Sequence, residues 1–269
     1  MMHSTVENFF GSIGRKTGEL REDLYLASKL INDTFYWMLV SPFRGKKVSR
    51  RAVISEMVKT GYDAVPVIAF VSFLIGIILA LQAAYQLRMT GSVMFVVNIV
   101  GVSLTREIAP VMTAILVAGR SGSAIAAEIG SMKVAQEVDA LVTMGINPVK
   151  FLVVPKLIAL VFMLPALTLF ADFIGIFGGF LLSATELGIH PFVYFEKTVE
   201  VLLMKDIVAG MIKAASFGVV IALVGAYHGF KVRGGAEDVG KRTTKSVMAS
   251  NLFVIMLDAF FVMMFYFFS

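Results

Sequence analysis

The sequence contains no cysteine, only three histidines and few charged residues, which make up 16% of its 269 positions. The absence of cysteine excludes disulfides, thiol nucleophiles and cysteine-ligated metals. The histidines are scattered, so no His, Asp and Glu set has metal-ligand spacing, and neither a Ser-His-Asp order nor a nucleophile elbow is present. We therefore predict that the chain is not an enzyme, has no catalytic residue and no metal site, and binds no cofactor itself.

Hydrophobic residues are abundant: they make up 58% of the chain, and the mean hydropathy is +0.83. These values lie far outside the range of soluble domains. A membrane-spanning helix needs about 20 mostly apolar residues, and five runs of the chain meet that need. We predict an all-α membrane protein whose five transmembrane helices lie at about 64–87, 93–119, 149–182, 207–229 and 247–268.

Residues 1–63 are predicted to form a cytosolic and interfacial segment ahead of a five-span domain at 64–269. Within this segment, apolar side chains at helical spacing lead into the aromatic cluster Phe35, Tyr36 and Trp37. Such a pattern is typical of an amphipathic helix that lies at the lipid headgroup level. No signal peptide is apparent, so we expect the amino terminus to stay in the cytosol.

Lysine and arginine are unevenly distributed along the chain. Ten lie within residues 1–64, four within 120–156 and five within 230–246, whereas the two remaining connections hold only Arg88, Lys197 and Lys205. Basic residues gather on the cytoplasmic side of membrane proteins. We therefore predict a cytoplasmic amino terminus and a carboxyl terminus on the opposite side. The same rule explains the net charge of +5, so we predict no nucleic-acid partner.

Small residues recur every four positions at Ala118, Gly122, Ala126 and Gly130. On a helix they form one ridge, which another backbone can approach closely. The following stretch, 131–145, has apolar side chains at helical spacing with Lys133, Glu137 and Asp139 among them, and it is too short and polar to span a bilayer. We predict a short helix there that lies in the cytosol and joins a transport channel to a motor.

Arg106 and Glu107 lie deep in the second apolar run, where charges are costly and face a cavity or a partner. Adjacent helical residues point about 100° apart, so we expect that these two do not pair side by side. Two interpretations remain open: a role in a substrate or proton path, and a structural link to a neighbouring span. Lys213 is expected to form a structural ion pair with either Asp172 or Asp258.

Two other functions are alternatives to transport driven by a motor. A proton-coupled secondary transporter would use Glu107, Asp172 and Asp258, but it predicts internal repeats with paired broken helices, which five unequal spans do not show. A membrane enzyme would need catalytic groups clustered at one interface.

Residues 235–243 approach the sequence of a phosphate-binding loop, but Arg242 occupies the position of the hydroxyl that holds magnesium. Any ATP must therefore bind to a partner.

Several blocks together resemble the MlaE (YrbE) permeases, the membrane subunits of ABC-type lipid transporters. The likeness covers roughly residues 45–269, with Gly expected in place of Asp238. The blocks are 104–110 (LTREIAP), 118–130 (AGRSGSAIAAEIG), 132–133, 139–141, 144–148 and 234–244.

The resemblance implies a homodimer in the cell inner membrane, with its carboxyl terminus in the periplasm. It further implies a cytosolic ABC ATPase subunit that holds ATP and Mg, and an MCE-domain substrate-binding protein in the periplasm. The cargo is expected to be phospholipid, with Arg106 and Glu107 as candidates for the lipid pathway. Residues 131–145 resemble the family's coupling helix. The expected ATPase contacts are Glu128, Met132, Lys133, Glu137, Asp139 and Met144.

Overall fold

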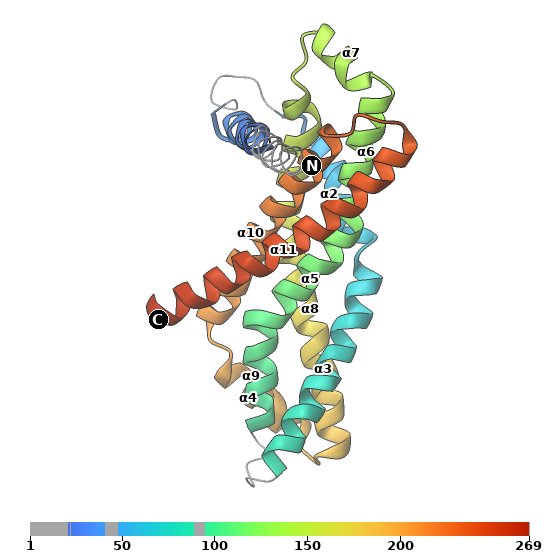
Figure 1. Cartoon of the computed structure of the whole chain (residues 1–269). Coiled ribbons are helices and arrows are strands. Elements are labelled where there is room, and N and C mark those ends of the chain that lie inside the picture. The colour runs from blue at the N-terminus through green and yellow to red at the C-terminus, as the bar shows by residue number, and fades with distance from the viewer. Residues whose placement is uncertain (1–20, 22, 41–47, 89–94, 269) are drawn as a thin grey trace, which may run out of the picture.

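The described part of the chain, residues 21, 23–40, 48–88 and 95–268 of the computed structural model, is helical and contains no strand. It forms an elongated bundle (Figure 1). Five stretches are long and apolar enough to cross a membrane, which confirms the prediction of an all-α membrane protein with five spanning helices. They are Val65–Leu87, Phe95–Val134, Val149–Glu186, Met204–Phe230 and Ala236–Phe267.

Each of these stretches is built from one helix or from several joined end to end through π-helical turns, written η. The first, fourth and fifth are single helices: α3 (Val65–Arg88), α10 (Met204–Phe230) and α11 (Ala236–Phe268). The third joins η5 (Val149–Val153) to α8 (Val154–Glu186). The second runs through α4 (Phe95–Ser103), η3 (Leu104–Ile108), α5 (Ala109–Val117), η4 (Ala118–Gly122) and α6 (Ser123–Val134).

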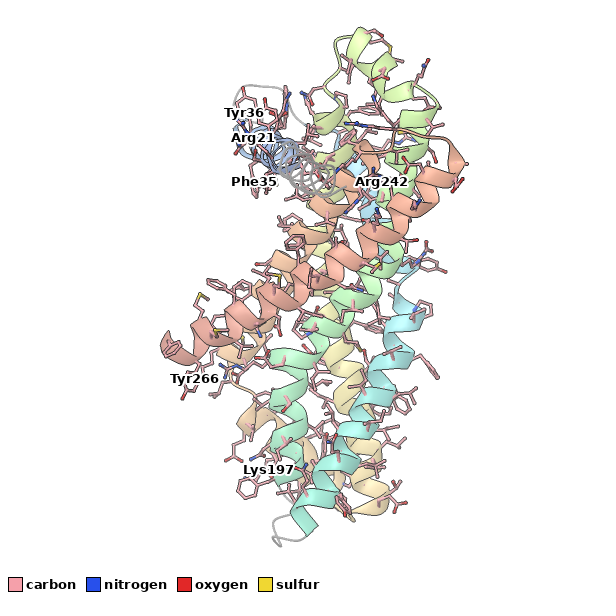
Figure 2. All side chains as sticks on the ribbon, viewed as in Figure 1. Arg21, Phe35, Tyr36, Lys197, Arg242 and Tyr266 are labelled. Atoms are coloured by element: carbon pink, nitrogen blue, oxygen red, sulfur yellow. The ribbon has the colours of Figure 1, made fainter. Side chains whose placement is uncertain are left out.

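The two ends of the bundle carry different short helices. α2 (Arg50–Tyr62) and α7 (Glu137–Thr143) lie at one end, which we call the α7 end. α9 (Pro191–Val201) lies at the other, the α9 end. Figure 2 shows Lys197 near the α9 end and Arg242 near the α7 end. It also places Tyr266 on the last turns of α11, which runs obliquely and leaves the side of the bundle.

The amino-terminal helix, residues 23–35, continues into the turn η1 (Tyr36–Val40) and lies beside the bundle, toward the α7 end (Figure 1). Lys231, which follows α10, donates a hydrogen bond to Asp23. That bond holds the pKa of the Asp23 carboxyl below its usual range. Residues 1–20 of the predicted interfacial segment lie outside the described part of the chain.

Glycines bring α3 and α8 into backbone contact. A Cβ atom at Gly76 would overlap the carbonyl oxygen of Gly175, and one at Gly179 would lie 3.4 Å from the carbonyl oxygen of Gly76. Gly175 and Gly179, which have GxxxG spacing, therefore face α3. Such small-residue contacts let spanning helices gain close van der Waals packing where the lipid offers no hydrophobic driving force.

The ridge of small residues packs against α10. Ala118, Gly122, Ala126 and Gly130 are all buried. A Cβ atom at Gly122 would lie 3.0 Å from Cγ2 of Ile221 on α10. On the other side of the contact, a Cβ atom at Gly229 would lie 3.1 Å from the carbonyl oxygen of Ala126. The second stretch and α10 are thus closely packed at these small residues.

Two spanning helices extend more than ten residues beyond a predicted end. The second continues to Val134 instead of ending near 119, because its polar residues find partners without breaking the helix. Ser123 donates to the carbonyl oxygen of Gly119, 2.6 Å away, and Arg120 pairs with Asp63 at 2.6 Å. The fifth begins at Ala236 instead of 247. The carboxylate of Asp238, in its first turn, holds the preceding residues in place by accepting from the backbone N–H groups of residues 233 and 234.

The predicted single helix at 131–145 is in fact two pieces. α6 ends at Val134, Gln136 takes a left-handed backbone conformation with φ 59°, and α7 follows at Glu137–Thr143. Lys133 bridges the break by donating to Asp139 at 2.7 Å. Periodicity did not reveal the break because the apolar positions keep helical spacing on both sides of a one-residue reversal.

Candidate functional site

Lys213 is the centre of a charge network inside the bundle. It lies in the first half of α10 with its side chain fully buried. Its ammonium donates to Glu107 on η3 and, over 3.0 Å, to Asp258 on α11. One cation therefore joins three of the five spanning stretches. A buried ammonium is tolerable in an apolar bundle only with such partners.

Arg106 extends this network toward a cavity. Its guanidinium lies 3.8 Å from the carboxylate of Asp206, near the start of α10, and about a third of its side chain is exposed. The cavity beside it has a volume of about 280 Å³. It is lined by Arg106, Lys205, Asp206, Val208, Ala209, Ile212 and Phe265. A mostly apolar cavity with charged groups on one side can hold a charged headgroup together with a hydrocarbon chain.

The structure corrects one expectation about Arg106 and Glu107. Their side chains do approach each other, with Nε of Arg106 3.9 Å from Oε1 of Glu107. Both side chains are long, and the π-helical turn η3 places them on a widened part of the helix. The contact is at the outer limit for an ion pair, and each residue has a second charged partner on α10.

The expected ion pair of Lys213 forms with Asp258, not with Asp172. Asp172, on α8, is 7% exposed, and its Oδ1 atom has no hydrogen-bond partner within the described residues. Asp206 was not singled out from the sequence. It lies next to a polar connection, where a charged residue gives no sign of being buried. Its spacing of seven residues from Lys213, which places both on one face of a helix, is the signal that could have found it.

The α7 end carries the second group of predicted residues. Val138 and Leu141 are buried and hold α7 against the bundle, whereas Glu137, Asp139 and Met144 are exposed. Met132 and Lys133 are half-buried beside them. α7 thus presents an acidic and apolar outer face. Glu128 does not share it, because its carboxylate binds Lys156 on α8 at 2.7 Å.

No group of three or more His, Asp or Glu side chains is placed to hold a metal ion in the part of the chain that the structure describes. Five spanning stretches, three of which are joined by an internal charge network, define a multi-pass membrane protein. Comparison with known proteins specifies the family. The model of the family described as Permease MlaE matches residues 53–264, and the chain belongs to this family of membrane permeases.

Named relatives agree with this assignment. A "Probable ABC transporter permease protein" of Rickettsia typhi is 36% identical over 203 residues, which cover 76% of this chain and 78% of the relative. The "Intermembrane phospholipid transport system permease protein MlaE" of Haemophilus influenzae is 29% identical over 257 residues, which cover 94% and 95%. "Protein TRIGALACTOSYLDIACYLGLYCEROL 1, chloroplastic" of Arabidopsis thaliana is 32% identical over 223 residues, which cover 83% and 63%.

Proposed function

We propose that the chain is the permease subunit of an ABC transporter that moves phospholipid between the inner membrane and a periplasmic MCE-domain protein. A separate cytosolic ATPase subunit, which holds ATP and Mg, drives it. The observation that carries the proposal is the cavity at Arg106, which places a partly exposed cation beside an apolar surface formed by the first turns of α10 and the end of α11. The family membership and the phospholipid named in the Haemophilus relative support it.

The proposed orientation puts the α7 end in the cytosol. Residues 120–156 and 230–246, which hold nine Lys and Arg, lie at or near this end. The amino terminus is then cytoplasmic and the carboxyl terminus periplasmic, in agreement with the positive-inside rule. This orientation presents α7 to the ATPase and opens the path of the lipid toward the periplasmic partner.

Arg106 is proposed to bind the lipid phosphate. A guanidinium donates two parallel hydrogen bonds to a phosphate, which a lysine cannot do. At 3.8 Å its contact with Asp206 is long enough to be exchanged for a phosphate. Glu107 is held by Lys213 and fixes the position of its neighbour. The lipid pathway therefore uses Arg106 for contact and Glu107 for placement.

Motion is proposed to reach this cavity from the ATPase through α7. The contacts are Met132, Lys133, Glu137, Asp139 and Met144, and Glu128 acts behind them through Lys156. The close-packed ridge at Ala118, Gly122, Ala126 and Gly130 then transmits the displacement to α10 as a rigid unit. Two copies of the chain form the homodimer, and the lipid cavity opens at their common axis.

An ATP-dependent lipid-transfer assay tests the role of Arg106. In proteoliposomes holding the chain with its ATPase and MCE partners, Arg106→Gln is expected to lower phospholipid transfer at least tenfold while ATP hydrolysis continues. Arg106→Lys keeps the charge but loses the fork, so transfer stays well below wild type. The control is Arg51→Gln, an exposed arginine of α2. Undiminished transfer by Arg106→Gln would remove Arg106 from the pathway.

Proton-coupled secondary transport through Glu107, Asp172 and Asp258 remains the second candidate. The observation in its favour is the buried Asp172 carboxyl, whose Oδ1 atom lacks a partner within the described residues. In this mechanism a pH gradient drives lipid movement in the chain alone, without nucleotide, and Asp172→Asn abolishes it. The ABC mechanism predicts no movement without ATP and its partner subunit.

A further inference from the structure

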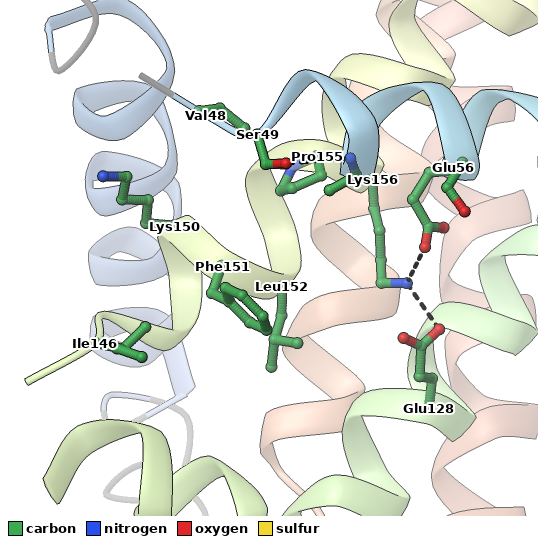
Figure 3. A pocket seen from close by; sticks show the side chains of 12 residues that line it. Val48, Ser49, Glu56, Glu128, Ile146, Lys150, Phe151, Leu152, Pro155 and Lys156 are labelled. Atoms are coloured by element: carbon green, nitrogen blue, oxygen red, sulfur yellow. Dashed lines mark hydrogen bonds and ion pairs between the residues drawn. The ribbon is translucent and has the colours of Figure 1, made fainter. Parts of the chain in front are cut away.

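Three charged side chains at the α7 end bind one another. A cavity of about 470 Å³ lies there between α2, α6, η5 and the start of α8 (Figure 3). On its wall, the buried Lys156 donates to Glu56 at 3.1 Å and to Glu128 at 2.7 Å. These bonds join α2, α6 and α8, so the charges serve contacts within the chain.

At the α9 end, in contrast, large apolar side chains are exposed on a short helix. α9 begins after His190, whose Nδ1 atom accepts from the backbone N–H of Phe192 at 3.3 Å, and Pro191 suits the first turn. Phe192, Phe195 and Val199 leave 70%, 51% and 78% of their surface exposed. At about 100° per residue, these three side chains lie within an arc of about 60°. α9 therefore has one continuous apolar face that the described part of the chain leaves uncovered.

A second arc of α9 fixes the helix to the bundle. Tyr194 is buried and donates to the carbonyl oxygen of Ile176 on α8 at 3.3 Å. Thr198, four residues further on, is buried as well. Residues four apart lie on the same side of a helix. These two side chains therefore set the rotation of α9, and with it the direction in which the apolar face points.

The third arc of α9 is charged. It carries Glu196, Lys197 and Glu200, and Lys197 donates to Glu200 at 2.5 Å. Both glutamates are exposed. An exposed apolar arc beside a charged arc is typical of a helix that lies flat in the interface between a membrane and water.

The apolar face of α9 continues a surface of the spanning helices. The ring centre of Phe195 lies 5.1 Å from that of Phe180 on α8. Phe180 in turn lies 6.1 Å from Phe177, and Phe177 lies 6.4 Å from Phe73 on α3. Half of the surface of Phe177 is exposed, and α3 and α8 are both long and apolar enough to span the membrane. Exposed apolar side chains on such helices face lipid, so the same lipid borders α9.

We propose that α9 lies in the interface layer of the membrane, with Phe192, Phe195 and Val199 among the acyl chains. The charged arc then lies among the headgroups, where water solvates it. The partner of this surface is the lipid bilayer. The acyl chains that surround α3 and α8 reach the apolar face of α9 without a break, so no second protein is needed to cover it.

This placement sets the level of the membrane beside the Arg106 cavity. Leu202 and Leu203 connect α9 directly to α10, whose first turn carries Lys205 and Asp206 of the cavity wall. That wall then lies close to the headgroup layer, within reach of lipid from the same leaflet. Only this consequence rests on the proposed function. α9 binds the bilayer without nucleotide or partner subunit, so either proposal can fail while the other holds.

Single cysteines test the placement, since the chain has none of its own. Val199→Cys and Glu200→Cys each carry a nitroxide spin label in liposomes of phosphatidylethanolamine and phosphatidylglycerol. The two positions are adjacent in sequence and about 100° apart around α9. Electron paramagnetic resonance compares collisions with oxygen, which concentrates in lipid, and with a nickel chelate, which stays in water. We expect the oxygen-to-nickel ratio at position 199 to be at least severalfold above that at position 200.

Phe192→Cys repeats the measurement on the same arc, and Phe70→Cys, at an exposed position of α3, supplies the value for lipid. All four side chains are exposed, so the variants are expected to unfold thermally like the unlabelled chain. Frequent nickel collisions at both 199 and 200 would place α9 in water and overturn the proposal. A label at 199 that meets neither reagent would mean that protein covers the face, which would overturn it as well.

Discussion

Lys213 is the side chain that joins the other members of the internal charge network. It is fully buried and binds two carboxylates from two other spanning stretches. Removing a charged group from water costs several kcal/mol, and the partners offset this cost only while all of them are present. The stability of the folded chain therefore depends on the whole set of charges. Removing one charged side chain is costly unless its partners are neutralised as well.

Lys213→Met is expected to destabilise the folded chain by about 3–5 kcal/mol, because Glu107 and Asp258 are left without their cation. The measurement is unfolding in detergent, followed by circular dichroism. A triple variant that adds Glu107→Gln and Asp258→Asn carries no stranded charge and should recover most of the stability. If Lys213→Met alone unfolds like wild type, the network does not hold the helices together.

The spanning helices are organised by where backbones touch. α3 meets α8 through Gly76 and Gly175, and the second spanning stretch meets α10 through Gly122 and Gly229. The four-residue spacing of small residues predicts that such contacts exist. It does not predict which helix is the partner. Which face meets which neighbour depends on helix rotation, and a uniformly apolar helix such as α3 gives no sequence signal of rotation.

Gly76→Ala is expected to prevent stable packing of α3 on α8, because its Cβ atom would overlap the carbonyl oxygen of Gly175. The yield of folded, monodisperse protein in mild detergent is the readout, and it should fall severalfold. The matched control is Gly240→Ala on α11, where nothing lies within 4 Å of the added Cβ atom. That change should be neutral or add up to about 1 kcal/mol of helix stability. Equal yields for both variants would contradict the described contact.

α7 is held by its buried apolar side chains, and its acidic face is free to contact a partner. The double variant Glu137→Lys and Asp139→Lys reverses this face and removes the Lys133–Asp139 bond. We expect it to release the ATPase subunit or to uncouple ATP hydrolysis from lipid transfer, while the membrane helices stay folded. Co-purification and the transfer assay measure both. Normal assembly with normal transfer would exclude α7 as the coupling element.

For the molecule as a whole, composition predicted the number of spanning helices, because length and hydropathy alone decide whether a segment can cross a bilayer. The end of the second helix was predicted less well, since Arg120 finds its partner Asp63 only in the folded chain. Charges inside apolar runs pointed to Arg106, Glu107, Lys213 and Asp258. Their pairing, and the part played by Asp206, follow from tertiary contacts that spacing does not encode.

α11 gives the molecule an asymmetric outline. It leaves the side of the bundle, and its second half exposes large apolar side chains (Figures 1 and 2). They include Leu252, Phe253, Ile255, Met256, Phe260, Met263 and Phe267. In a membrane such a surface faces lipid or a second copy of the chain. In the proposed homodimer, this surface can face either the lipid or the second copy.

The central claim is that the chain is the permease of an ABC lipid transporter. The most direct test is to purify the tagged chain from its own membranes in mild detergent and to identify by mass spectrometry the proteins and lipids that accompany it. The permease assignment predicts three companions: a P-loop ATPase, an MCE-domain protein and phospholipid. A chain that stays alone after crosslinking would contradict transport driven by an ABC ATPase, and Asp172 and its fellow carboxylates would then be the groups to test for proton coupling.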